Sequence, residues 1–95
     1  MGVLMAMIAL MLKIDEEHVA DAVQGACEKL DGAEGEVVLD FSSVRRIDSR
    51  ALTAMEKLAA AAEGKGVKVL LRGVNVDIYK VLKLVKLTSR FSFLT

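Results

Sequence analysis

A block of apolar residues followed by a polar connector and a helical pattern marks the middle of the chain. The apolar run at residues 37–39 ends on Asp40, as in strands that are buried on both faces. The connector leads to Ser49, where apolar residues begin to recur at helical spacing. Asp or Ser at such a point is a helix start signal, because its side-chain oxygen accepts hydrogen bonds from the first turn. We therefore predict a strand over 36–41 and a helix over about 49–63, with Ser49 at the carboxyl edge of a sheet, where binding residues of open α/β folds are concentrated.

Patterns on either side predict further elements. The predicted strands cover 3–12, 67–71 and 90–94, and the predicted helices cover 15–31 and a segment capped by Asp77. Glycines are expected to end the helices, at Gly32 and Gly35 and again at Gly64 and Gly66. The predicted inner faces are Val19, Val23, Cys27 and Leu30; Leu52, Met55, Leu58 and Ala62; and Ile78, Val81, Leu82 and Val85. Strands that alternate with helices imply a mostly parallel sheet. The fold class is therefore α/β, a small sandwich of about four strands with alternating helices in one domain over 1–95.

Composition indicates which kinds of partner the protein binds and which cellular compartment it occupies. Thirteen basic and thirteen acidic residues leave no net charge, so no nucleic-acid groove is expected. A single cysteine fits a reducing compartment, and we expect a cytoplasmic protein. The apolar stretch at residues 2–12 is shorter than the roughly 20 residues that a membrane-spanning helix needs. We interpret it as a buried strand, with residues 1–10 either part of that strand or in part not native, and we expect no membrane insertion.

Candidate catalytic and metal-binding groups are few. His18 is the only histidine and is typical of a solvated surface residue at the start of a helix. Cys27 falls on an apolar helical stripe, which favours a buried, inert thiol. Gly64-Lys65-Gly66 lacks the spacing of a phosphate-binding loop and follows a helix, so it is interpreted as a helix stop. No group of His, Cys, Asp or Glu residues has the spacing of a metal site. The sequence predicts neither an enzyme nor a cofactor.

Four stretches of the chain are similar to a known family. They read VVLDFSSV at 37–44, IDSRAL at 47–52, GVKVLLRGV at 66–74 and LMLKID at 10–15. The second resembles the Asp-Ser-Ser/Thr-Gly-Leu signature of the STAS family, and the first resembles that family's central strand. STAS domains occur in bacterial anti-sigma-factor antagonists, stressosome proteins and the cytoplasmic tails of sulfate transporters. The resemblance covers nearly the whole chain.

The resemblance implies roles for residues near the signature. Ser49 matches the serine that a partner kinase phosphorylates, Asp48 matches the neighbouring acid, and Asp40 matches the polar residue at the strand end. Two positions differ from the family pattern. Arg50 replaces a small hydroxyl residue and Ala51 replaces a glycine, as in the branch that resembles the stressosome scaffold. These changes bear on whether a serine kinase recognises the loop.

The N-terminal part of the chain also differs from the family pattern. Leu12 stands where the family has a glycine, and the first strand of the family's usual opening hairpin is either shortened or lost. This leaves a sheet edge that a protein partner or a second copy of the chain is able to cover.

Two functions follow from the resemblance. The first is a regulatory protein-binding module in bacterial signal transduction and transcription regulation, which binds an anti-sigma factor with serine kinase activity or joins a signalling complex. The second is an accessory subunit that binds the ATPase of a lipid-type membrane transporter. The predicted partner-binding residues are Asp40, Ser42, Arg46, Asp48, Ser49, Arg50, Thr53, Glu56 and Lys57.

Each of these residues also has a purely structural interpretation. Ser49 would then be a plain helix cap, and Asp40 a turn residue at the end of a strand. The arginines at positions 45, 46 and 50 either hold a phosphate or an acidic partner, or form an ordinary solvated surface.

Overall fold

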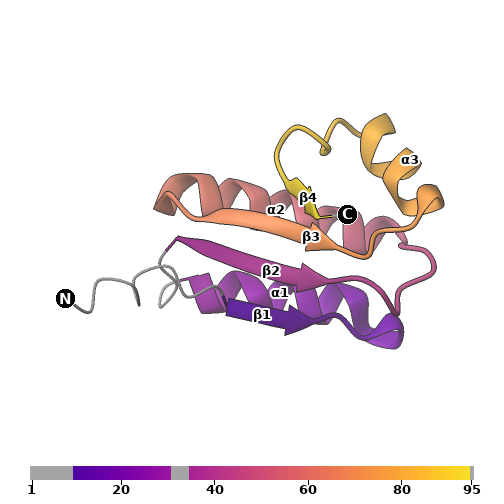
Figure 1. Ribbon diagram of the computed structural model, residues 1–95, viewed down its shortest axis with the longest axis horizontal. Coiled ribbons are helices and arrows are strands. Elements are labelled where there is room, and N and C mark those ends of the chain that lie inside the picture. The colour runs from indigo at the N-terminus through magenta and orange to yellow at the C-terminus, as the bar shows by residue number, and fades with distance from the viewer. Residues whose placement is uncertain (1–9, 31–34, 95) are drawn as a thin grey trace.

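Four parallel strands form one layer of the computed structural model, which describes residues 10–30 and 35–94 (Figure 1). Neighbouring strands follow the order of the sequence, β1-β2-β3-β4. Their bounds are Leu10–Lys13 for β1, Glu36–Asp40 for β2, Lys68–Arg72 for β3 and Ser92–Leu94 for β4. All three pairings are parallel, with Val38 opposite both Met11 and Leu70. The carboxyl ends of β1, β2 and β3 therefore meet at one edge of the sheet.

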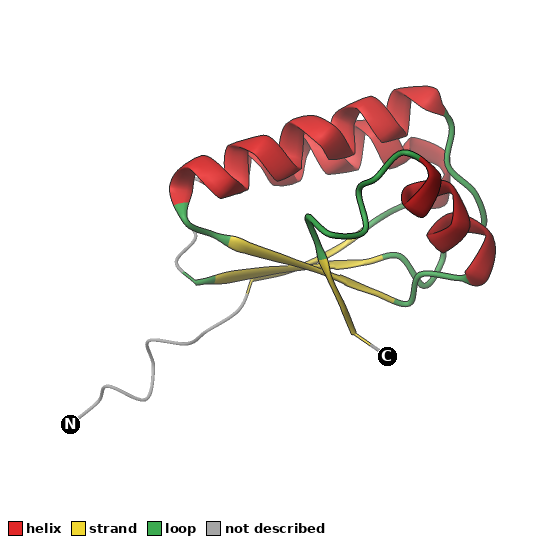
Figure 2. Ribbon diagram, turned by 90° about the horizontal axis from the view of Figure 1, so that it is seen from above, coloured by secondary structure: helices red, strands yellow, loops and turns green. Residues whose placement is uncertain are grey.

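Helices connect the strands and lie together on one side of the sheet (Figure 2). Their bounds are Glu16–His18 for the 3-10 turn η2, Val19–Lys29 for α1, Ser49–Lys65 for α2 and Val76–Leu84 for α3. α1 and α2 pack directly against each other. Among the described residues, no helix covers the opposite face of the sheet. The domain therefore consists of one helical layer on one sheet layer.

The core fills the space between these two layers. Alternate residues of β2 and β3, among them Leu39 and Leu71, point into the helical layer and are fully buried. Met55 and Leu58 of α2 meet them from above and are equally buried. Burial of such side chains provides most of the stabilisation of a small domain. The apolar stripe that defines the inner face of α2 thus also decides which of its residues face solvent.

The structure confirms the α/β class and the mostly parallel sheet that the sequence predicts. The predicted strand at 36–41 is β2, that at 67–71 is β3, and the tail at 90–94 contains β4. The strand predicted over 3–12 is seen from Leu10 onward; residues 3–9, like Gly32, lie outside the described residues.

Two helix ends differ from the prediction. Asn75, not Asp77, caps α3, because its Oδ1 accepts a hydrogen bond from the backbone N–H of Ile78 at 2.8 Å. Gly64 does not stop α2, which continues to Lys65. Gly66 ends the helix in the left-handed conformation, with a φ of 70°, which glycine adopts without strain.

The inner faces of the helices also differ in detail. Ala51 and Ala59 are buried on the inner face of α2, whereas the predicted core residue Leu52 is only half-buried. Val85, predicted on the inner face of the third helix, lies just after its end and is 39% exposed. Small residues in α2 allow the helix to approach the sheet closely, and a pattern based on large apolar residues does not detect them.

Within residues 10–30 and 35–94, no helix has both the length and the apolar character needed to cross a membrane.

The packing leads to a prediction about stability. Leu39→Ala removes a side chain that is 0% exposed, so it should lower the free energy of unfolding by about 2–5 kcal/mol through lost burial and a residual cavity. Leu84→Ala is the matched control, because Leu84 is 81% exposed and its loss should change stability by no more than about 0.5 kcal/mol. Urea unfolding of both variants measures the difference. Equal effects would contradict the assignment of the core.

Candidate functional site

The loop after β2 begins with a turn that Asp40 stabilises. The backbone N–H of Ser42 donates to Asp40 Oδ1 at 2.9 Å, and the N–H of Val44 donates to the carbonyl of Phe41 at 2.9 Å. The pKa of the Asp40 carboxyl lies below its ordinary value, first because the Ser42 hydroxyl donates to it and then because of the Ser42 backbone N–H. Phe41 and Val44 are buried, so this part of the loop is attached to the core. Asp40 acts here as a turn residue.

The helix that follows begins at an acid. Asp48 is the N-cap of α2, and its Oδ1 accepts from the backbone N–H of Ala51 at 2.9 Å. Ser49 is the first residue of the helix and is exposed. The prediction that Ser49 lies at a helix N-terminus on the carboxyl edge of the sheet is therefore confirmed. The interpretation of Ser49 as the cap is wrong, because Asp48 occupies that position.

An open groove of about 480 Å³ lies between the outer faces of α1 and α2. Four of the predicted partner-binding residues line its α2 side, namely Ser49, Arg50, Thr53 and Lys57. Helical spacing explains this grouping, because residues three or four apart share one face of a helix. The structure thus brings Ser49 together with a hydroxyl and two cations on one exposed surface.

The α1 side of this groove was not predicted. It consists of Ala20, Gln24, Cys27 and Glu28, which precede Ser49 by more than twenty residues. The apolar stripe of α1 predicts the inner face of that helix. The polar residues beside the stripe could have indicated which side of α1 faces the groove. Cys27 is half-buried in this wall, so its thiol is less buried than the sequence predicts.

A second hollow, of about 310 Å³, lies between the start of α1 and the loop before α2. Arg46 and Asp48 of the loop and Arg50 of α2 line one side of it, and acidic residues of η2 line the other. Arg50 Nη2 lies 3.8 Å from Asp21 Oδ1, with both side chains more than two-thirds exposed. An ion pair this exposed contributes little to stability, so Arg50 remains available to other anions.

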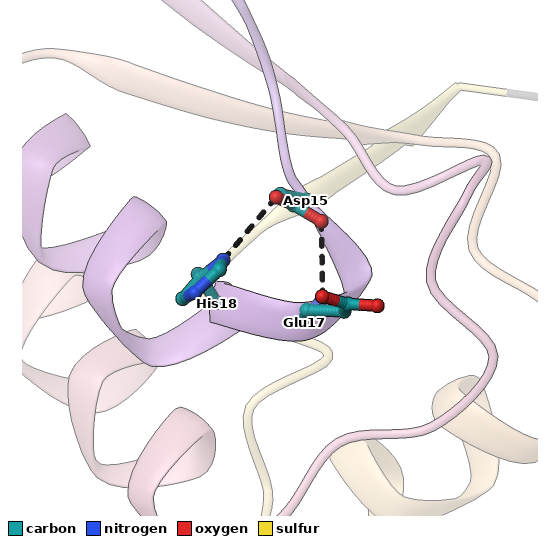
Figure 3. A network of polar contacts seen from close by, with 3 residues as sticks. All are labelled: Asp15, Glu17 and His18. Atoms are coloured by element: carbon teal, nitrogen blue, oxygen red, sulfur yellow. Dashed lines mark hydrogen bonds and ion pairs between the residues drawn. The ribbon is translucent and has the colours of Figure 1, made fainter.

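His18 lines this second hollow. Figure 3 shows it beside Asp15 and Glu17, at the turn that leads into α1. Its Nδ1 is 3.3 Å from Asp15 Oδ2, and the backbone N–H of Glu17 donates to Asp15 Oδ1 at 3.0 Å. These two contacts, the backbone one first, lower the pKa of Asp15. The geometry is that of a capped helix start with a solvated histidine, as the sequence predicts.

The remaining predicted residues lie apart from both hollows. Asp40, Ser42 and Glu56 line neither of them. Asp40 and Ser42 belong to the turn after β2, and Glu56 is an exposed residue of α2. The described residues contain no group of three or more His, Cys, Asp or Glu side chains arranged to hold a metal ion.

The cap assignment can be tested through stability. Asp48→Ala should lower the free energy of unfolding by about 1 kcal/mol, because the N–H of Ala51 loses its acceptor. Asp48→Asn keeps an acceptor and should retain most of that energy. Ser49→Ala should change stability by no more than about 0.5 kcal/mol, since Ser49 is exposed and is not the cap. Denaturant melts of the three variants decide the point, and a cost for Ser49→Ala equal to that for Asp48→Ala would refute it.

The turn after β2 gives a second prediction. Ser42→Ala removes the hydroxyl that favours the ionised form of Asp40, so the pKa of Asp40 should rise toward its ordinary value. Ser43→Ala, at the neighbouring exposed serine, is the control and should leave this pKa unchanged. An NMR titration of the Asp40 carboxyl carbon measures both. A pKa that does not move in Ser42→Ala would show that the hydroxyl does not contact the carboxylate in solution.

Comparison with known proteins places this arrangement in a family. Residues 5–94 match a family model described as "Mlab, STAS domain". A search of curated proteins finds no match. Two solved structures of the Thermotoga maritima protein TM1081 have a similar fold. The crystal structure, of a proposed anti-sigma factor antagonist, has 21% identity and a TM-score of 0.68, and the match covers 90% of this chain and 71% of the other. The NMR structure has 19% identity and a TM-score of 0.75, with 90% and 73% covered.

At these identities the two structures show the fold alone, whereas the family model spans nearly the whole sequence, including the strand, loop and helix that carry Asp40, Asp48 and Ser49. The chain therefore belongs to the STAS domain family.

Proposed function

We propose that this chain is a non-enzymatic regulatory module that binds a protein partner and that phosphorylation of Ser49 controls the binding. The proposed docking surface comprises the loop at 42–50 and the exposed face of α2 with Thr53, Glu56 and Lys57. The observation that carries the proposal is the position of Ser49, exposed at the first residue of α2 and on the wall of the groove between α1 and α2. A kinase can reach such a hydroxyl without unfolding the domain.

The fold is expected to tolerate a phosphate at Ser49. Phosphorylation adds about −1.5 to −2 charges at neutral pH. The N-terminus of a helix favours negative charge through its dipole and its free backbone N–H groups. In α2 the Asp48 carboxylate takes the N–H of Ala51, so the earlier N–H groups of the first turn are available to a phosphate. Modification should therefore change the surface and leave the core intact.

The same phosphate would weaken a tight interface. It would place new negative charge beside Asp48, which opposes an acidic partner, and the phosphate would have to lose water in any close contact. A loss of roughly 3 kcal/mol corresponds to a binding constant more than a hundredfold weaker. The signature at 47–52 resembles that of anti-sigma-factor antagonists, so the partner class that fits best is an anti-sigma factor with serine kinase activity. The binding would then take place in the cytoplasm of a bacterium.

Arginines near Ser49 allow the opposite effect, in which a phosphate strengthens binding. Arg50 and Arg46 are exposed and share the hollow with Asp48, so they are able to hold a phosphate by charge-assisted hydrogen bonds. In that case phosphorylation stabilises one state of the loop, and the partner recognises the modified form.

Arg50 and Ala51 also favour a second candidate function. Arg50 stands exposed where the family signature has a small hydroxyl residue, and it changes the surface that a kinase would approach. Ala51 is buried in place of glycine. A docking surface that is never phosphorylated suits an accessory subunit that binds a transporter ATPase continuously through α2. The two functions differ in whether binding depends on Ser49.

Partner capture from the native cell separates them. Ser49→Asp should lose a partner that wild type and Ser49→Ala retain, with melting temperatures that stay close to wild type. Ser89→Asp is the matched control, because Ser89 is exposed and lies outside the docking surface, and it should bind as wild type does.

Two results would count against phosphorylation control. Equal capture of one ATPase by wild type, Ser49→Asp and Ser49→Ala would support the transporter function. A loss of binding in Ser89→Asp as large as that in Ser49→Asp would show that added charge alone is responsible.

A further inference from the structure

One asparagine side chain joins the start of α3 to the docking loop. Asn75 Oδ1 accepts from the N–H of Ile78 at 2.8 Å and so caps α3. Its Nδ2 donates to the carbonyl of Arg45 at 2.9 Å and lies 3.4 Å from the carbonyl of Val44. The two linked segments are thirty residues apart in the sequence. The acceptor half of the amide serves the helix, and the donor half serves the loop.

Arg72 at the end of β3 and Gly73 after it contact the chain just before the docking loop and at its first residue. The N–H of Phe41 donates to the carbonyl of Arg72 at 2.7 Å. Gly73, with a φ of +73°, lies so close to Ser42 that a Cβ atom there would be 2.8 Å from the Ser42 Cβ. Arg72, Gly73 and Asn75 therefore contact the chain between Phe41 and Arg45. Of these contacts, that of Asn75 reaches furthest along the loop, to the Arg45 carbonyl.

The choice of asparagine is informative. Asp and Ser cap helices about as well as Asn does, because each has an oxygen that accepts from the first turn. Only Asn among these residues also has an amide N–H₂ group that can donate to a carbonyl. Capping alone would be satisfied by any of them, whereas the contact with the Arg45 carbonyl needs the amide nitrogen.

We infer that Asn75 is a positioning residue that orders the docking loop. This inference rests on the proposed function for its importance, since the loop at 42–50 is part of the proposed docking surface. Asn75 lies outside that surface and acts through the backbone of Arg45. A loop that is ordered before binding loses less conformational freedom in the complex, which increases affinity.

Two substitutions separate the loop contact from the cap. Asn75→Asp and Asn75→Ser each keep an acceptor for the N–H of Ile78 and remove the amide N–H₂ group that donates to the Arg45 carbonyl. They differ in charge, so an effect that both share does not come from charge. Asn75→Ala removes both contacts and shows the effect of losing the cap.

Amide hydrogen exchange of the isolated protein provides the readout. The Val44 amide, which bonds to Phe41 within the loop, should exchange roughly three- to tenfold faster in Asn75→Asp and Asn75→Ser, as the loss of one hydrogen bond predicts. The Ile78 amide should be unchanged in these two variants and faster only in Asn75→Ala. Trypsin cleavage after Arg45 and Arg46 should accelerate to a similar extent as Val44 exchange.

The outcome is decisive for Asn75 whether or not a partner is known. Unchanged Val44 exchange and unchanged trypsin cleavage in Asn75→Asp and Asn75→Ser would overturn the inference. If Val44 exchange rises equally with Ile78 exchange in those variants, Asn75 is only a helix cap and the inference also fails.

Capture of the wild-type partner by the same variants tests the proposed function separately. A looser loop with undiminished capture would leave the positioning role intact and would remove the loop from the docking surface.

Discussion

Burial of the apolar faces of α1 and α2 on a single face of a parallel sheet is the constraint on which the rest of the structure depends. Parallel strands require a crossover after each strand, and a helix that covers the sheet satisfies this requirement and buries its own apolar stripe. Met55 and Leu58 fix the rotation of α2 because they are fully buried against the sheet. Once that rotation is fixed, Ser49, Thr53 and Lys57 must lie on the outer face. The proposed docking surface is thus a consequence of core packing.

The same constraint supports the proposal that a modification at Ser49 changes the surface without changing the fold. Asp48 ends the loop and caps the helix, and the loop behind it is attached through Phe41 and Val44, which are buried. Asn75 adds a contact from the next crossover. The exposed serine therefore follows a loop that is attached to the core, and we expect charge added there to affect the surface more than the interior.

The sequence predicts most of the fold because its strong signals are local. Apolar runs locate β2 and β3, and the helical stripe locates α2, including Ser49 at its start. The details that differ have two origins. Asn75 rather than Asp77 caps α3 through a local contact with Ile78, and both residue types are common caps, so the pattern alone does not choose between them. The α1 wall of the groove reaches Ser49 only after the sheet has brought α1 and α2 together. No local pattern predicts that second feature.

The most direct test of the central claim is site-specific photocrosslinking in the native cell. A photoreactive amino acid is placed at position 53 on the docking surface, and in a second strain at position 79 on α3, outside it. The account predicts a protein crosslink from position 53 that disappears when Ser49→Asp is added, and none of that product from position 79. A crosslink from position 53 that is equally strong with Ser49→Asp, or a partner found only from position 79, would contradict it.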